Sequence, residues 1–100
     1  MSYIKLWVDD VRPMPNEYNK HAKTAKEAIE TVRQGNVIIM SLDHDLGEGG
    51  SGYDVACEIE KLAHDNVIMP IVWRVHSMNP VGRDKIIAAL RKADEYWLDW

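Results

Sequence analysis

The segment VIIMSLDHDLGEGG, residues 37–50, constrains the fold most strongly. Its apolar first part, Val37 to Leu42, is short enough for a strand that is buried on both faces. Asp43, His44 and Asp45 follow at once, and then a glycine-rich turn. Ligand sites in open α/β sheets lie at the carboxyl ends of strands. The segment therefore predicts a buried strand that delivers ionisable side chains to a site, while aspartates here are also typical of a plain turn.

Other apolar segments end in polar side chains in the same way. They predict strands over residues 3–8 and 69–75, and residues 18–23 are a short candidate strand between them. Asp9 and Asp10 follow the first of these strands, and His76 and Ser77 follow the last. Three polar clusters at strand ends favour one functional site over three unrelated turns.

Helices are expected between the strands, because capping signals precede apolar residues at helical spacing. The expected helices run from Thr24 to Gly35, from Ser51 to His64, and from Asn79 onward. Alternating strands and helices predict a parallel sheet with right-handed crossovers. A chain of 100 residues predicts one α/β domain, residues 1–100.

Composition narrows the class of partner. The net charge of −4 disfavours a long nucleic acid duplex, which needs many phosphate contacts, but leaves a nucleic-acid end or a small phosphate compound open. No segment is apolar enough to predict a membrane span or a signal peptide, so a cytoplasmic protein is expected. The single cysteine, Cys57, lies in an apolar helical pattern and predicts a buried thiol.

The strand-end motifs WVDD, LDHDL and HS resemble those of the response-regulator receiver domain. That resemblance implies a small doubly wound, flavodoxin-like α/β fold with three layers and a mostly parallel sheet. Two departures are clear. A loop with Pro13 and Pro15 replaces the first receiver helix, and the phosphate-binding lysine that follows the fifth receiver strand has no counterpart up to Trp100.

The sequence is more similar to a divergent branch, the cyclic-phosphate processing receiver domain. The similarity lies in LWVDDVRPMP, SLDHDLG, SGYDVA and HS-x-NPVG, which together run from Leu6 to Gly82. It implies the processing of cyclic phosphates, including those of nucleotides or RNA ends. The resemblance implies roles for Asp9, Asp10, Asp43, His44, Asp45, His76, Ser77 and Asn79.

A cyclic phosphodiesterase needs a base, an acid and positive charge on the phosphoryl oxygens. His44 and His76 could divide the base and acid roles, with Asp43 or Asp45 orienting His44. The candidate phosphate-binding residues are Arg12, Ser77, Asn79, Arg83, Gly49 and Gly50. The candidate ligands of Mg²⁺ or Mn²⁺ are Asp9, Asp10 and Asp43, since carboxylates are hard donors. Strong pairing with Arg12 is the alternative to a cation, and the two histidines keep zinc open.

Other functions fit parts of the pattern. A receiver-like module that binds a cyclic nucleotide or a partner protein without catalysis is the main alternative. The DxD of Asp43 and Asp45 suggests a haloacid-dehalogenase-type nucleophile, but that family places its acidic pair after the DxD strand. The aromatic tail, with Tyr96, Trp97 and Trp100, could form an edge strand, a lid on the core or a surface for a protein partner.

Overall fold

The computed structural model describes residues 2–100 as one α/β unit. Its strands are β1 (Ile4–Val8), β2 (Lys20–Ala22), β3 (Val37–Leu42) and β4 (Val72–Val75). Its helices are α1 (Ala25–Arg33), α2 (Gly52–His64) and α3 (Pro80–Tyr96), with short 3₁₀ helices over Gly47–Gly49 and Trp97–Asp99. All strands pair in parallel in the order β2-β1-β3-β4, which confirms the predicted parallel α/β fold.

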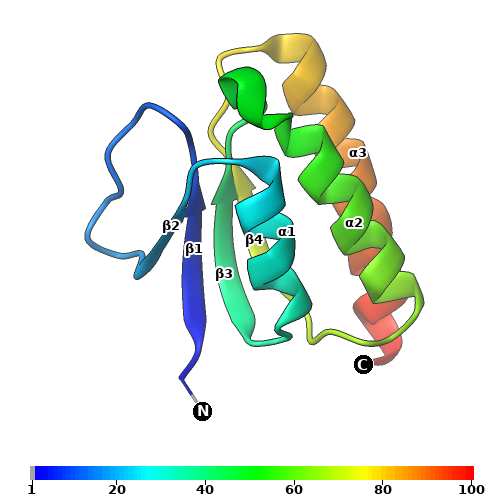
Figure 1. Cartoon of the computed structure of the whole chain (residues 1–100). Coiled ribbons are helices and arrows are strands. Elements are labelled where there is room, and N and C mark those ends of the chain that lie inside the picture. The colour runs from blue at the N-terminus through cyan, green and yellow to red at the C-terminus, as the bar shows by residue number, and fades with distance from the viewer. Residues whose placement is uncertain (1) are drawn as a thin grey trace.

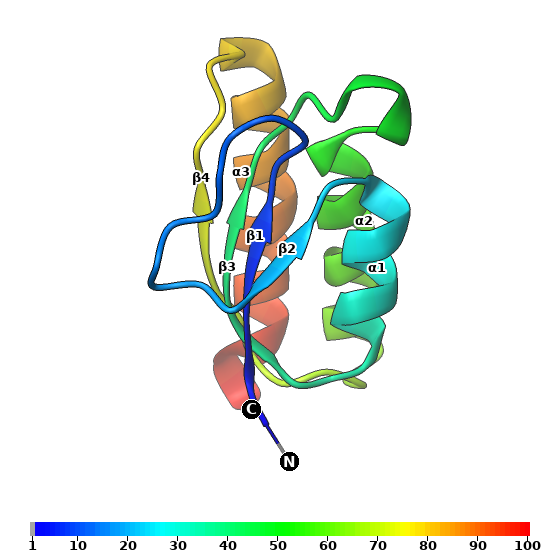
Figure 2. The ribbon, with the colours of Figure 1, turned by 60° about the vertical axis from the view of Figure 1, so that its left-hand side comes forward.

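The helices and the sheet bury one common core. Leu6 and Val8 from β1 and Met40 and Leu42 from β3 are fully buried and belong to one cluster with the helix stripes. The stripes of the three helices are Ala28 and Val32, then Val55, Ala56 and Ile59, then Ile86, Leu90 and Ala93. Figures 1 and 2 show α1, α2 and α3 together on one side of the sheet.

The other side of the sheet carries the loop from Asp9 to Asn19 in place of helices (Figure 2). The expected third layer is therefore a loop, because Pro13 and Pro15 prevent a helix between β1 and β2. Trp7 points to this side and packs against Tyr18, with the ring centroids 5.2 Å apart. The loop starts at the carboxyl end of β1 and returns along the strand, where the Asn19 amide donates to Lys5 O at 2.9 Å.

Helix capping follows the sequence closely. The Ser51 hydroxyl accepts from the Asp54 amide at 3.2 Å, and Asp54 accepts from the Ser51 amide at 3.1 Å, so this capping box is complete. Thr24 accepts from the Glu27 amide, but the Glu27 carboxylate bonds to the Thr24 hydroxyl instead of a backbone amide. Asn79 caps α3 by accepting from the Gly82 amide at 3.0 Å.

Two local expectations change. Cys57 is exposed, so the prediction of a buried thiol was wrong: the buried stripe of α2 runs through Val55, Ala56 and Ile59, and Cys57 lies on another side of the helix. The aromatic tail is helical and forms no strand. Its Trp97 is buried against the core, while Tyr96 and Trp100 are exposed.

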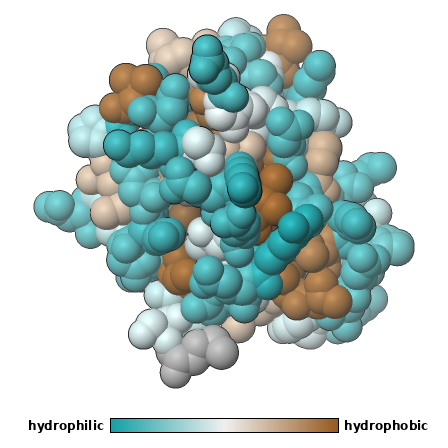
Figure 3. All heavy atoms as spheres, viewed as in Figure 1, coloured by the Kyte–Doolittle hydropathy of each residue, from teal (hydrophilic) through white to brown (hydrophobic). Residues whose placement is uncertain are grey.

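The carboxyl ends of the strands lie together at the top of Figure 1, and the C-terminus lies at the other end. In the same view the surface is mainly hydrophilic, with apolar atoms in separate groups (Figure 3). Within residues 2–100, no helix combines the length and the apolar character needed to cross a membrane.

Candidate functional site

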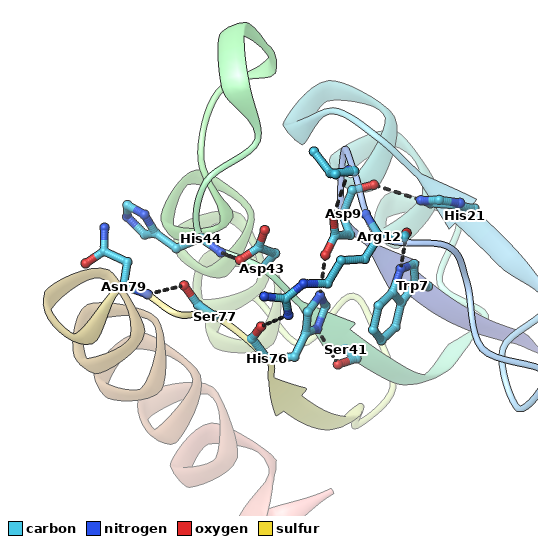
Figure 4. A network of polar contacts seen from close by, with 11 residues as sticks. Trp7, Asp9, Arg12, His21, Ser41, Asp43, His44, His76, Ser77 and Asn79 are labelled. Carbon is cyan, nitrogen blue, oxygen red and sulfur yellow. Dashed lines mark hydrogen bonds and ion pairs between the residues drawn. The ribbon is translucent and has the colours of Figure 1, made fainter.

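The register of the sheet brings Asp9, Asp43 and His76 together. Val8 pairs with Leu42, and Leu42 pairs with Val75. The ladder continues one residue further, because the Asp43 amide donates to Val8 O at 3.0 Å and the His76 amide donates to Leu42 O at 3.1 Å. Asp9, Asp43 and His76 therefore occupy equivalent positions directly after three adjacent strands. Figure 4 shows them as a close group.

Asp9 is the centre of the polar network. It is 1% exposed, and its Oδ1 accepts from the amides of Val11 and Arg12, each at 2.8 Å. Its Oδ2 lies 2.9 Å from His76 Nε2. Burial acts to raise the pKa of Asp9, but the two amides and His76 outweigh it, so the pKa lies below its ordinary value. Asp9 is therefore a fixed, ionised carboxylate.

Both ring nitrogens of His76 are occupied. Nε2 faces Asp9, and Nδ1 lies 2.7 Å from the hydroxyl of Ser41. The ring stacks on Trp7, with centroids 4.0 Å apart and planes within 5°. Burial lowers the pKa of His76, although the hydrogen bond and charge of Asp9 act to raise it. This imidazole holds Asp9 in place and has no free nitrogen for a substrate.

A second acidic group stands beside Asp9. Ligand oxygens of Asp9, Asp10 and Asp43 all lie within 4.8 Å of one another. Asp43 accepts from the His44 amide at 2.9 Å. Burial, and then the charge of Asp9, raises the pKa of Asp43 above its ordinary value. Three carboxylates this close repel each other unless positive charge reaches them.

Arg12 supplies positive charge beside the three carboxylates. Its Nη1 donates to His76 O at 3.0 Å, and this bond ties the loop after β1 to the loop after β4 (Figure 4). Arg12 and the three carboxylates line one open cavity of about 450 Å³. The other residues lining it are Val11, Asp45, Gly47 and Met78.

His44 lies apart from this cavity. Its side chain extends away from Asp43 towards Asn79 in Figure 4. A Cβ added at Gly82 would lie 2.3 Å from His44 Cγ, so the ring packs directly against the first turn of α3. His44 Nδ1 lies 3.0 Å from Asp45 Oδ1. The structure thus brings Asp45 to the cavity but does not bring His44 and His76 to a shared pocket.

The expected phosphate-binding residues are also divided. Ser77 accepts from the Asn79 amide at 3.1 Å, and both residues shape the start of α3. Arg83 donates to Val75 O at 3.2 Å, on the outer edge of β4. Added Cβ atoms at Gly49 and Gly50 would meet Thr24 and Ala25, so these glycines pack against the start of α1. Of the expected set, only Arg12 lines the acidic cavity.

Several further residues contribute to the site without a predicted role. The Ser41 hydroxyl is hydrogen-bonded to His76, and the Trp7 ring stacks on it. His21 Nε2 lies 2.7 Å from Asp9 O. Ser41 left one signal, because it is a hydroxyl in an otherwise apolar strand. Val11, Gly47 and Met78 also line the cavity. Val11 and Gly47 lie within the motifs LWVDDVRPMP and SLDHDLG, and Met78 is the variable position of HS-x-NPVG, but their residue types do not indicate a role in the site.

Comparisons with known proteins agree with the fold. A family model described as the cyclic-phosphate processing receiver domain matches residues 4–92. No curated protein and no solved structure gave a match. The matched range contains all four strands and every residue of the acidic cavity.

Proposed function

The chain belongs to the cyclic-phosphate processing receiver family, and from that premise we propose that it hydrolyses a cyclic phosphodiester in the acidic cavity. The observation that carries the proposal is the meeting of three carboxylates with Arg12 in one cavity at the carboxyl ends of β1 and β3. A phosphoryl group needs both positive charge and a positioned water for hydrolysis. The cavity offers groups for both tasks.

A divalent cation fits the donor set. Asp9, Asp10 and Asp43 offer only hard oxygen atoms, the donor type that Mg²⁺ and Mn²⁺ prefer. The raised pKa of Asp43 reflects burial and the charge of Asp9. A bound cation would offset the repulsion between these two carboxylates. Zinc fits less well, because His76 has both nitrogens occupied and His44 points away. A bound cation would neutralise phosphoryl oxygens and acidify a bound water.

The protein's own groups then have distinct tasks. Arg12 has one N–H bonded to His76 O, which holds the guanidinium at the cavity, and its remaining N–H groups suit a phosphate. His76 positions Asp9. We assign proton transfer to Asp45, which lines the cavity. Its Oδ1 lies 3.0 Å from His44 Nδ1, so His44 can exchange a proton with it. We prefer this assignment to a division of acid and base roles between His44 and His76, because neither histidine lines the cavity and both ring nitrogens of His76 are occupied.

The test is product formation from 2′,3′-cyclic nucleotides, followed by phosphorus NMR, which separates a cyclic phosphate from an open monoester. The wild type should form product with Mg²⁺ or Mn²⁺ and none with EDTA. Asp43→Asn should lose at least about a hundredfold in rate, within the range for removing one electrostatic group. The absence of product under all conditions, or full activity of Asp43→Asn, would sink the proposal.

His64 provides a matched control for His44. It lies at the end of α2, and its Nδ1 faces the next residue, Asp65, at 3.2 Å, as His44 faces Asp45. His44→Gln should slow hydrolysis, whereas His64→Gln should leave it unchanged. Equal effects of the two substitutions would remove His44 from the mechanism.

A binding module without catalysis remains the second candidate. The observation in its favour is that neither histidine lines the cavity. Such a module would bind the cyclic nucleotide in a calorimetric titration, with Arg12→Ala weakening it, and would form no product.

A further inference from the structure

Two exposed aliphatic side chains stand at the rim of the acidic cavity. Val11 and Met78 both line it, and each is 82% exposed. Apolar side chains exposed beside a charged cavity are candidates for ligand contact.

Backbone amides at or next to both residues are hydrogen-bonded. The Val11 amide donates to Asp9 Oδ1 at 2.8 Å, and Met78 lies between Ser77 and Asn79, which are themselves hydrogen-bonded at 3.1 Å. The two loops follow β1 and β4, which lie on the two sides of β3. Arg12 joins them through its bond to His76 O. The backbone beside both residues is therefore hydrogen-bonded, while the two side chains are exposed at the rim of the cavity.

The volume of the cavity indicates which kind of ligand would contact Val11 and Met78. About 450 Å³ lies within the usual range for a site that holds a whole small organic ligand, and it exceeds the needs of a cyclic phosphate ring alone. A group attached to that ring would extend from Arg12 and the carboxylates towards the rim. A nucleobase suits this position, since its flat faces pack well between apolar side chains.

We propose that Val11 and Met78 form an apolar clamp for the base of a nucleoside cyclic phosphate and so determine specificity. This inference rests on the proposed function, because the same cavity holds the phosphate. It goes further by naming the residues that distinguish a nucleoside substrate from a base-free one.

The experiment compares two compounds that share a five-membered cyclic phosphodiester, namely 2′,3′-cyclic AMP and glycerol 1,2-cyclic phosphate. The tested variant is Val11→Thr with Met78→Gln, which keeps the approximate shapes and removes the apolar character. The matched control is Val67→Thr with Leu98→Gln, at residues that are also exposed but do not line the cavity. Rates with Mg²⁺ give kcat/KM for each compound and protein.

We expect the tested variant to lose about tenfold in kcat/KM for 2′,3′-cyclic AMP, which corresponds to about 1.4 kcal/mol. Its kcat/KM for glycerol 1,2-cyclic phosphate should stay unchanged. The control variant should match the wild type on both. Equal loss on the two compounds, or no loss on either, would overturn the clamp.

The clamp can also be tested by binding alone, so its failure is distinguishable from failure of the proposed hydrolysis. If the wild type turns over neither compound, calorimetric titration with the same two compounds still decides. A preference of about tenfold for cyclic AMP that disappears in the tested variant supports the clamp. Equal Kd values for the two compounds in the wild type refute it.

Discussion

Asp43→Asn should make the cation-free protein more stable, although it removes a central residue of the site. Burial and the charge of Asp9 raise the pKa of Asp43 in the folded state. A raised pKa means that the folded state binds this proton more readily than the unfolded state does. Stability is therefore lost as the pH rises through that value, and the loss persists at neutral pH. The neutral amide removes this repulsion, and its oxygen can still accept from the His44 amide.

The expected gain is on the order of 1 kcal/mol, as for other single substitutions that relieve unfavourable charge. A divalent cation should reverse the order of the two proteins. A ligand at a hundred times its Kd adds about 2.7 kcal/mol to the protein that binds it. The wild type should gain stability of this order from saturating Mg²⁺, and Asp43→Asn, which lacks one of three carboxylates, should gain much less.

Urea unfolding at neutral pH, followed by tryptophan fluorescence, measures both effects in EDTA and in Mg²⁺. Equal m-values in all samples are required for the comparison, since a changed m-value would indicate a changed unfolded or native state. Asp65→Asn is the control, because this exposed aspartate contacts only His64 among the described charged residues. Its stability should change by less than about 0.5 kcal/mol.

Two results would refute the reasoning separately. A lower stability of Asp43→Asn in EDTA would show that like-charge repulsion is not the dominant effect at this position. An equal response of both proteins to Mg²⁺ would show that Asp43 is not a ligand, whatever the effect in EDTA.

Three further predictions concern the support of the site. Because burial lowers the pKa of His76, the unfolded state takes up its proton first, so stability should fall as the pH drops from about 6.5 through the lowered value; urea midpoints across this range should show it, and His76→Gln should flatten the curve. Gly82→Ala should displace His44, whose Cγ would lie 2.3 Å from the new Cβ, and should slow cyclic nucleotide hydrolysis as much as His44→Gln does, with no further loss in the double variant. Asp9→Ala should cost about 3 kcal/mol of unfolding free energy, because His76 and two amides lose a buried partner; a loss below about 1 kcal/mol in urea would contradict the central role of Asp9.

The strands, the helices and their order could be read from the sequence because each signal is local. Capping residues such as Ser51 and Asn79 satisfy amides within their own helix, and apolar runs alone indicate the buried strands. The exposure of Cys57 has no such local signal. Several neighbours of Cys57 are apolar, and only the packing of α2 decides which side of the helix is buried.

The separation of the two histidines was within reach of the sequence once the register was known. Side chains alternate along a strand, and Asp43 continues β3 in register with His76 after β4. His44 is one residue further and therefore points elsewhere. Strand ends alone do not show this alternation, because the relative register of two strands depends on tertiary pairing. The contact between His44 and Gly82 depends on the packing of α3, and no local sequence pattern predicts it.

The loop after β1 explains why so much of the site lies on one short segment. The amides of Val11 and Arg12 both donate to Asp9 Oδ1, as the free amides of a helix N-terminus do to a capping side chain, but Pro13 and Pro15 prevent the chain from continuing as a helix. Trp7 fixes the same turn by donating from Nε1 to Arg12 O at 3.2 Å, while its ring supports His76. Trp7 therefore connects the acidic cluster and the arginine to the sheet. The loop replaces a layer of helices, yet it supplies a preorganised carboxylate, a guanidinium and an apolar rim residue within four positions of the chain.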